Sequence, residues 1–257
     1  MMMKAITKNR YGGPEVLQLR EVNMPIPKDD EVLVEVKANA ANPADWHVMR
    51  GEPILARFAF GLFKPRKEIL GSDFAGIVKE TGKNVRRFKV GDRVYGENLS
   101  NGAFAEYTCV PEHALAIMPE KTDFAEMACI PIPGITAYQA LITHGKLKEG
   151  ESVLINGASG GVGHMAVQIA KAYGAQVTSV TSSKNVEFAK QLGADHALAY
   201  DKEDIHNHQE KYDLILDTHG NLNYNDFKRM GKRGVVIGFT TLGHMISVQL
   251  KCAIKKY

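Results

Sequence analysis

The chain has 257 residues, of which 44% are hydrophobic and 24% are charged, as is usual for a globular protein of one or two domains. Its net charge of +3 is too small to indicate a nucleic-acid partner, and no basic stripe with an aromatic platform is present. The start lacks the apolar core of a signal peptide, and no stretch approaches the roughly 18 apolar residues of a membrane span. The three scattered cysteines signal neither a disulfide framework nor a zinc ribbon. We therefore expect a cytoplasmic protein with no integral membrane segment.

The first 122 residues are predicted to form β structure. Residues 31–41 alternate apolar and polar side chains with the period of a half-buried strand. Gly or Pro bounds three further short strand candidates, 74–82, 91–97 and 103–111. Many short strands with frequent turn signals predict a barrel or a sandwich.

From residue 123 to 257 the pattern changes to alternating helices and strands. Helical spacing marks residues 123–130, for which Asp123 is the expected N-cap, and then 134–145. Apolar strands are predicted at 152–156, 176–181, 196–200, 212–218 and 233–239. Helices are predicted at 162–175, with an apolar face of Val162, Ala166, Ile169, Ala170 and Tyr173, and at 185–194. This alternation predicts an α/β domain with a doubly wound parallel sheet.

A glycine cluster, INGASGGVGHMA at 155–166, lies between the first of these strands and the following helix. Read as A-x-G-x-x-G, it places Ala158, Gly160 and Gly163 at the key positions of a dinucleotide fingerprint. Glycines let the backbone approach a pyrophosphate, and the helix N-terminus offers free N–H groups to it. The alternative is a plain tight turn, which the surrounding βαβ pattern disfavours.

The end of the second strand of this domain bears on the choice of cofactor. A carboxylate there would accept hydrogen bonds from the ribose of NAD and repel a 2′-phosphate. The sequence instead has hydroxyl residues and a lysine, from Thr181 through Ser182 to Lys184. Hydroxyl and ammonium groups favour a phosphate, so we expect NADPH as cofactor. The alternative for Lys184 is a solvated lysine with no ligand. Tyr200, at the end of the next strand, is expected to lie against the adenine ribose; the alternative for this residue is simple packing.

Motifs along nearly the whole chain carry a family resemblance. In order, they are YGGPEVLQL (11–19), NPADWHVMRG (42–51), GSDFAGIV (71–78), VGDRVYG (90–96), GAFAEY (102–107), PGITAYQAL (133–141), NGASGGVGHMAVQIAKAYGAQV (156–177) and YDLILDTHG (212–220). The chain resembles the medium-chain dehydrogenase/reductase superfamily, in its zinc-free quinone oxidoreductase-like (zeta-crystallin-like) branch. The resemblance implies a GroES-like β-barrel domain that binds substrate, a Rossmann domain that binds NADP, and an active site in the cleft between them.

The resemblance also bears on metal binding. Zinc members of the superfamily bind catalytic zinc through Cys, His, Glu and a second Cys, and the corresponding residues here are Asn42, Ser72, Asp73 and Ile132. One carboxylate with three residues that are not zinc ligands does not make a catalytic zinc site. The run of four cysteines that holds a structural zinc in the superfamily is also missing. We therefore expect no metal.

Without a metal, the expected substrates are quinones and α,β-unsaturated carbonyls, because conjugation spreads the developing negative charge onto an oxygen. The resemblance places Asn42 and Asp45 in the wall of the cleft, Asn42 as a donor to the substrate oxygen and Asp45 as an orienting group. His47 stands where many relatives carry Tyr, and either a proton donor or a packed loop histidine fits there.

The resemblance and the strand ends together give a set of cofactor-binding candidates. They are Thr136, Ser159, Gly160, Gly161, Val162, Gly163, Ser182, Lys184, Tyr200, Thr218, Gly238 and Phe239. The apolar segment 52–67, which ends in basic residues, fits a packed loop, a lid over the substrate or a surface that rests on membranes.

Two further expectations concern the C-terminal end and the class of function. Relatives continue beyond Tyr257, so a sixth sheet strand, the completion of the barrel and often the dimer edge are expected to be missing; a homodimer stays possible. The alternatives to a quinone or enone reductase are a zinc-type alcohol dehydrogenase and a non-catalytic NADPH-binding sensor or interaction protein.

Overall fold

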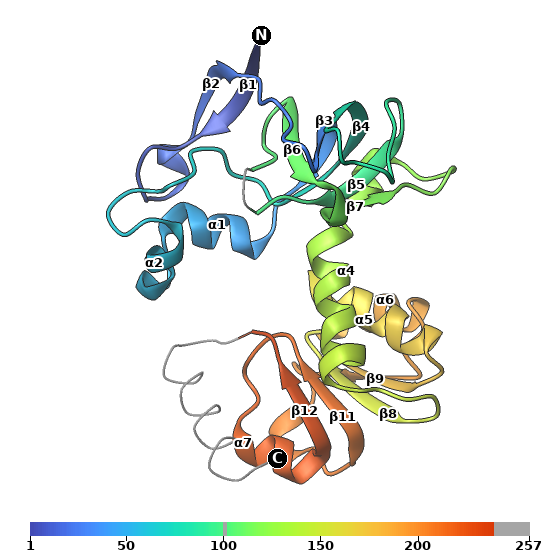
Figure 1. Ribbon diagram of the computed structural model, residues 1–257. Coiled ribbons are helices and arrows are strands. Elements are labelled where there is room, and N and C mark those ends of the chain that lie inside the picture. The colour runs from blue at the N-terminus through green and yellow to red at the C-terminus, as the bar shows by residue number, and fades with distance from the viewer. Residues whose placement is uncertain (100–101, 239–257) are drawn as a thin grey trace. The chain divides into compact units, whose positions relative to one another are not determined.

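The computed structural model describes residues 1–99 and 102–238, and the chain divides into two compact units (Figure 1). Unit 1 covers Met1–Ile132 and unit 2 begins at Pro133, so the boundary falls inside α4 (Pro131–Tyr138). The sequence pattern predicts a boundary nearer the N-terminus, after residue 122. The helix α3 (Phe124–Ala128) follows that point, and its Met127 and Ala128 pack in one apolar cluster with Ala75 of the unit 1 sheet.

Unit 1 is built on an antiparallel sheet of five strands in the order β6-β3-β4-β5-β7. The strands are β3 (Glu31–Ala40), β4 (Asp73–Thr81), β5 (Arg93–Glu97), β6 (Tyr107–Pro111) and β7 (Leu115–Ile117). Their inward side chains form a core that includes Val32, Val34, Phe74, Val78 and Val94. Short 3₁₀ turns lie at Pro14–Val16 and Glu112–Ala114.

The N-terminal ribbon of unit 1 was not predicted from the sequence. It consists of β1 (Met2–Thr7) and β2 (Gln18–Asn23), which pair antiparallel with each other. Isolated bridges from Ala5 to Ala105 and from Thr7 to Ile69 connect it to the rest of the unit. Nearly all side chains of β2 are exposed, including the apolar Leu19. The strand therefore lacks the alternation of apolar and polar residues by which a half-buried strand is predicted.

Two helices and a 3₁₀ turn separate β3 from β4: α1 (Pro43–Arg50), the turn Ile54–Ala56 and α2 (Arg57–Phe60). The N-terminus of α1 is capped by Asp45, whose Oδ2 accepts the N–H of Asn42 at 2.7 Å. At the other end, the buried Lys8 ammonium donates to the Val48 carbonyl at 2.5 Å. A cation at the C-terminal carbonyls complements the helix dipole, so α1 is fixed at both ends.

Unit 2 contains a parallel sheet of five strands in the order β10-β9-β8-β11-β12 within the described residues. The strands are β8 (Ser152–Asn156), β9 (Gln176–Thr181), β10 (His196–Ala199), β11 (Tyr212–Asp217) and β12 (Gly231–Val236). Leu154, Ile155 and Leu214–Leu216 are fully buried, as both faces of a parallel sheet require.

Helices cover both faces of this sheet. The helices α5 (Gly161–Ala172) and α6 (Val186–Gln191) contribute to the core cluster that contains Val153 and Ile155. The helix α7 (Tyr224–Met230) contributes Met230 to the cluster that contains Leu154 and Ile215, on the opposite face. Short 3₁₀ turns lie at Ser183–Asn185 and Ile205–Asn207. The predicted doubly wound α/β domain is therefore confirmed.

Three details of unit 2 differ from the sequence expectation. The helix predicted over 134–145 is α-helical only to Tyr138 and continues as a π-helix over Gln139–His144. Tyr173, expected on the buried face of α5, is exposed and donates its hydroxyl to the Tyr138 hydroxyl at 3.3 Å. The helix α7 was not predicted, although Asn223 and Asp226 form a capping box at its start.

Candidate functional site

A buried polar cluster in unit 1 joins the start of α1 to the start of β4. The Asn42 side-chain amide donates to Asp73 Oδ2 at 2.9 Å, and the backbone N–H of Ile132 donates to the same oxygen at 3.1 Å. Ser72 donates its hydroxyl to Asp45 Oδ1 at 2.6 Å. All four polar side chains are buried. Their mutual hydrogen bonds are what allows two carboxylates to lie in the interior.

The two carboxylates of this cluster have different surroundings. Burial raises the pKa of Asp73 to about 6, and the nearby carboxylates of Asp45 and Glu97 add to the rise. The hydrogen bonds from Asn42 and Ile132 oppose it. The charge of Asp73 therefore changes in the mildly acidic range.

The donor set of this cluster does not fit a catalytic zinc ion. At the positions that hold zinc in zinc-dependent members of the superfamily, the side-chain amide of Asn42, the hydroxyl of Ser72 and the backbone N–H of Ile132 all act as hydrogen-bond donors. Within residues 1–99 and 102–238, no group of three or more His, Cys, Asp or Glu side chains is placed to hold a metal. That the protein works without a metal stays a prediction, and its support is the chemistry of these donors.

A cavity of about 380 Å³ opens beside this cluster. Asp45 and Ser72 line one part of it, and apolar side chains line much of the rest, among them Val48, Phe60, Ile69 and Leu70. Arg66 and Lys67 also reach it. A mostly apolar cavity with two polar groups at one end suits a small, flat, conjugated molecule.

His47 lies on α1 but is not among the residues that line this cavity. Its Nδ1 lies 3.0 Å from the carbonyl oxygen of Glu52, and because a carbonyl only accepts, Nδ1 is the protonated nitrogen of the neutral ring. The ring stacks on Trp46 with centroids 3.8 Å apart. These contacts describe a histidine that orders a loop, and its role as a proton donor stays a prediction.

The glycine loop of unit 2 has the shape that a dinucleotide requires. Gly157 has φ +82°, in the left-handed region, which lets the chain turn sharply after β8. A Cβ at Gly163 would lie 2.1 Å from the Gly157 carbonyl oxygen, so this glycine permits close packing of α5 on the loop. A Cβ at Gly161 would meet only Pro133 Cγ, at 3.9 Å, and no side chain caps the N-terminus of α5 at Gly160. The first N–H groups of α5 are therefore accessible to an anion.

A cavity of about 530 Å³ lies against this loop and brings together four of the predicted cofactor residues: Ser159, Gly160, Tyr200 and Thr218. The Thr181 hydroxyl donates to Ser159 Oγ at 2.8 Å, and the Thr218 hydroxyl donates to the Asn156 carbonyl at 2.8 Å, so strand ends and loop form one floor. The predicted residues that do not line it are Thr136, Gly161, Val162, Gly163, Ser182, Lys184 and Gly238. Phe239 lies outside the described residues.

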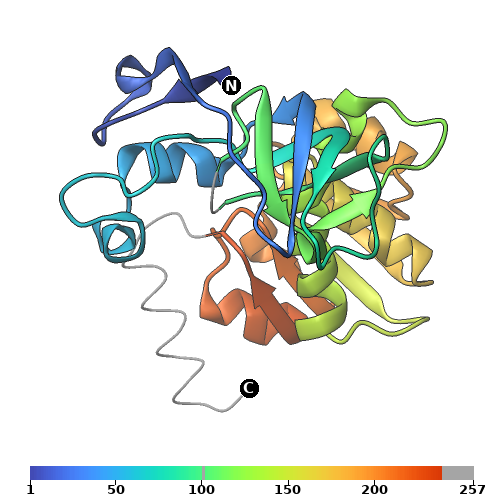
Figure 2. The ribbon, with the colours of Figure 1, turned by 45° about the horizontal axis from the view of Figure 1, so that its top comes forward.

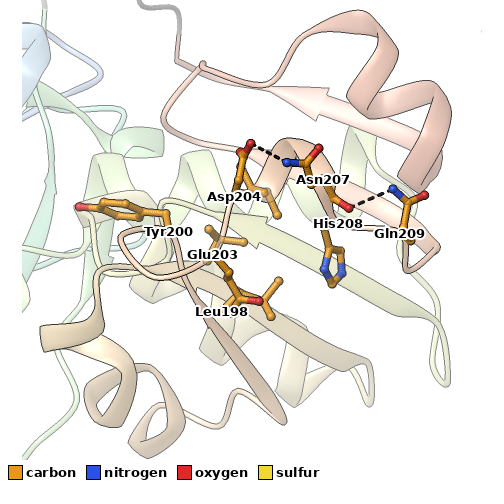
Figure 3. Close-up of a pocket in the computed structure, with 9 residues that line it drawn as sticks. Leu198, Tyr200, Glu203, Asp204, Asn207, His208 and Gln209 are labelled. Atoms are coloured by element: carbon orange, nitrogen blue, oxygen red, sulfur yellow. Dashed lines mark hydrogen bonds between the residues drawn. The ribbon is translucent and has the colours of Figure 1, made fainter.

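A second cavity, of about 310 Å³, is lined by Tyr200, Asp204 and other side chains (Figure 3). It shares Tyr200, Asp204 and Ile205 with the first cavity. Tyr200 is 60% exposed, so it is not a packed core residue. Asn207 donates to Asp204 at 3.0 Å and orders the loop that carries both. The two cavities together form an elongated site along the C-terminal ends of the strands, where nucleotides bind in open α/β sheets.

Sequence reasoning missed two carboxylates at this site. Asp217 is fully buried at the end of β11 and accepts the Asn156 amide at 2.8 Å and the Gly220 N–H at 2.8 Å, which fixes the loop after β11. Asp201, after β10, accepts the backbone N–H of Ser183 at 2.7 Å and its hydroxyl at 2.6 Å. A polar residue at the end of an apolar strand was the available signal for Asp217. Pairing between β9 and β10 brings Asp201 beside Ser183, and the sequence alone does not show that pairing.

Known proteins resemble the chain along most of its length. The profile described as alcohol dehydrogenase GroES-like domain matches residues 28–120, and the profile described as zinc-binding dehydrogenase matches residues 161–255. The human protein named quinone oxidoreductase is 36% identical over 252 residues, which cover 92% of this chain and 73% of the human protein. The chain belongs to the medium-chain dehydrogenase/reductase superfamily.

Two further relatives place it among the quinone oxidoreductase-like members. The structure of the quinone oxidoreductase from Coxiella burnetii superimposes with a TM-score of 0.83 at 31% identity, covering 98% of this chain and 80% of that one. A chloroplastic protein of Arabidopsis thaliana, named NADPH-dependent alkenal/one oxidoreductase, is 38% identical over 235 residues, covering 85% of this chain and 58% of that protein.

This medium-chain dehydrogenase/reductase is an oxidoreductase, and its family uses a nicotinamide cofactor. The predicted GroES-like and Rossmann architecture is confirmed, as is the resemblance from which it was drawn. In the part of the chain that the structure describes, no helix has both the length and the apolar character needed to cross a bilayer.

Proposed function

We propose that this protein reduces quinones or α,β-unsaturated carbonyls with NADPH and without a metal ion. The observation that carries the proposal is the cluster of Asn42, Ser72 and Asp73. Asn42 and Ser72 act as hydrogen-bond donors where a zinc enzyme would have metal ligands, Asp73 accepts the hydrogen bond from Asn42, and the cluster adjoins a mostly apolar cavity. The names of the human and Arabidopsis relatives support the same class of substrate.

The cofactor site fits a dinucleotide with an anionic centre. Gly160 and Gly161 leave the N-terminus of α5 accessible, and Thr181 and Ser159 form a hydroxyl floor beside it. A bound nicotinamide cofactor supplies the hydride for the reaction. We propose NADPH in preference to NADH because β9 ends in Thr181, without a carboxylate, and Lys184 follows in an exposed position. The Asp201 carboxylate opposes this preference, although both of its oxygens are held by Ser183.

Residues of unit 1 would bind and polarise the substrate. One amide hydrogen of Asn42 is used by Asp73, and we assign the second to an oxygen of the substrate. Asn42 itself is not among the residues that line the cavity, but its neighbours Asp45 and Ser72 are. Asp45 and Ser72 hold the start of α1, and therefore Asn42, in one orientation. A single donor is sufficient for conjugated acceptors, because conjugation already stabilises the developing negative charge.

The test is oxidation of NADPH by the purified chain with a panel of 1,4-quinones, cyclic enones and saturated aldehydes. We expect turnover of the quinones and enones, unchanged after treatment with a chelator, and no stoichiometric zinc by elemental analysis. Alcohol oxidation that depends on bound zinc would instead identify a zinc-type alcohol dehydrogenase. Tight binding of NADPH with no turnover of any acceptor would favour a non-catalytic sensor.

A further inference from the structure

The stretch 54–67 of unit 1, here called the apolar segment, presents large hydrophobic side chains to solvent. It contains the 3₁₀ turn Ile54–Ala56, the helix α2 and the loop that follows (Figures 1 and 2). Ile54 is 71% exposed, Phe58 is 67% exposed and Phe63 is 91% exposed; Leu55, Phe60 and Leu62 are exposed as well. Single exposed apolar residues are ordinary, but a contiguous group of this size marks an interaction surface.

The charges around the apolar segment have mostly one sign. Residues 46–68 contain five basic and two acidic side chains, a net charge of +3, which equals that of the whole chain. Lys64 and Arg66 are exposed next to Phe63. Exposed aromatic side chains bordered by cations are the composition of surfaces that lie on anionic bilayers.

The apolar segment is held in a defined conformation by unit 1. The Tyr11 hydroxyl donates to the Gly61 carbonyl at 2.6 Å, and Arg57 donates to the Gly51 carbonyl at 3.0 Å while its guanidinium stacks on the Tyr11 ring. The N–H of Arg66 donates to the Phe60 carbonyl at 2.8 Å. The exposed side chains are therefore presented by an ordered loop.

We propose that the apolar segment docks the protein on the anionic surface of a phospholipid bilayer. Ile54, Phe58 and Phe63 would enter the headgroup region, and Lys64 and Arg66 would contact lipid phosphates. A second copy of the chain fits this surface less well, because a two-fold contact of the patch with itself would bring cations against cations.

The position of the apolar segment gives docking a consequence, which rests on the proposed function. Phe60 and Arg66 line the same cavity of about 380 Å³ that Asp45 and Ser72 line. A hydrophobic quinone dissolved in the bilayer would therefore meet the cavity from the side on which the protein is docked.

The experiment is co-sedimentation of the full chain with vesicles, without substrate or cofactor. Vesicles of phosphatidylcholine alone are compared with vesicles that also contain phosphatidylglycerol. We expect binding to the anionic vesicles only, weakening as salt is added because screening reduces attraction to the surface. The double variant Phe58→Ser/Phe63→Ser and the variant Lys64→Glu should each weaken the partition onto anionic vesicles about tenfold or more.

The matched control is Ile26→Ser, because Ile26 is an equally exposed apolar residue of unit 1, at 83%, outside the apolar segment. It should bind vesicles like the unchanged chain, and circular dichroism should show all variants folded. Failure of the unchanged chain to bind anionic vesicles would overturn the proposal. So would undiminished binding by the double variant, or a double variant whose only change is loss of self-association.

The outcome is separable from that of the proposed function. The vesicle assay contains no acceptor and no NADPH, so its failure leaves the reductase activity untested and standing. Conversely, a chain that binds anionic vesicles but reduces no quinone would support docking and contradict the substrate class.

Discussion

The two units of this protein form their sites by different means. In unit 1 the site consists of side chains that satisfy one another, with Asn42 bound to Asp73 and Ser72 bound to Asp45. In unit 2 the site consists mainly of backbone, since Gly157 and Gly163 shape a loop that borders a cavity and leads into the uncapped N-terminus of α5. Unit 1 should therefore respond to changes of chemical identity, and unit 2 to bulk added at the glycines that pack closely.

The largest expected effect is in the glycine loop of unit 2. Gly163→Ala places a methyl group 2.1 Å from the Gly157 carbonyl oxygen, so the loop must move away from α5. We expect a loss of about 3 kcal/mol in the free energy of unfolding, and NADPH binding weakened about 100-fold or more. Chemical denaturation and fluorescence titration with NADPH measure the two effects.

Gly161→Ala is the control, because its methyl group would meet only Pro133 Cγ at 3.9 Å. Its free energy of unfolding should change by less than about 0.5 kcal/mol. Equal destabilisation by the two substitutions would contradict the conclusion that Gly163 is needed for close packing of α5 on the loop while Gly161 is not.

The next effect concerns the buried carboxylate of unit 1. Because the pKa of Asp73 is about 6 in the folded protein and near 4 when unfolded, the folded state holds its proton more tightly. Stability from this group is therefore fully present below pH 4 and is lost as the pH rises through 6. In denaturant titrations, the wild type should lose about 3 kcal/mol between pH 4 and 7 relative to Asp73→Asn. Parallel pH profiles for the two proteins would show that Asp73 does not titrate as proposed.

Removing the proposed substrate donor should lower catalysis, and it also takes one hydrogen bond from the buried Asp73 carboxylate. Asn42→Ala deletes the amide that donates to Asp73 and is proposed to polarise the substrate, and we expect kcat/KM with a quinone to fall about 100-fold. Asn39→Ala is the control, since the Asn39 amide donates to two backbone carbonyls, that of Ala103 at 2.7 Å and that of Asp73 at 3.5 Å, and has no proposed role toward the substrate. An equal loss of kcat/KM in both variants, measured in steady-state assays, would show that Asn42 does not act on the substrate.

Cofactor preference should depend on two opposite charges, Lys184 after β9 and Asp201 after the neighbouring strand β10. Lys184→Ala should weaken NADPH binding about tenfold and leave NADH binding unchanged, because only NADPH carries the 2′-phosphate. Asp201→Asn keeps an acceptor for Ser183 and removes a negative charge, so it should strengthen NADPH binding a few-fold. The measurement is the pair of dissociation constants, for NADPH and for NADH, of each variant. A ratio of the two constants that stays the same in both variants would show that the 2′-phosphate binds elsewhere.

The smallest expected effect is at His47. Its Nδ1–H is used by the Glu52 carbonyl, its ring lies on Trp46, and it is not among the residues that line the cavity. We expect His47→Gln to change kcat less than about threefold and to leave the pH profile of kcat in place. A large fall in kcat with loss of its alkaline limb would identify His47 as the proton donor after all.

Local sequence patterns predicted most of the architecture. The alternation in β3, the apolar strands of unit 2 and the cap at Asp123 were all visible, because each depends on side chains a few positions apart. The ribbon of β1 and β2 was not visible, since β2 is exposed along nearly its whole length and the bridges that attach the ribbon to unit 1 join residues distant in the sequence. The helix α7 was missed because its polar start outweighed its apolar residues.

The candidate sites divide in the same way. The sequence by itself determined the glycine loop, the hydroxyl end of β9 and the replacement of zinc ligands by Asn42 and Ser72, because these depend on which residue stands where. Only the tertiary structure decided that Asp201 lies beside Ser183 and that Asp73 is buried with a raised pKa. It also decided that the Nδ1 of His47 is hydrogen-bonded to the backbone carbonyl of Glu52. Burial, hydrogen-bond partners and cavities arise when distant segments pack together, and no local pattern encodes them.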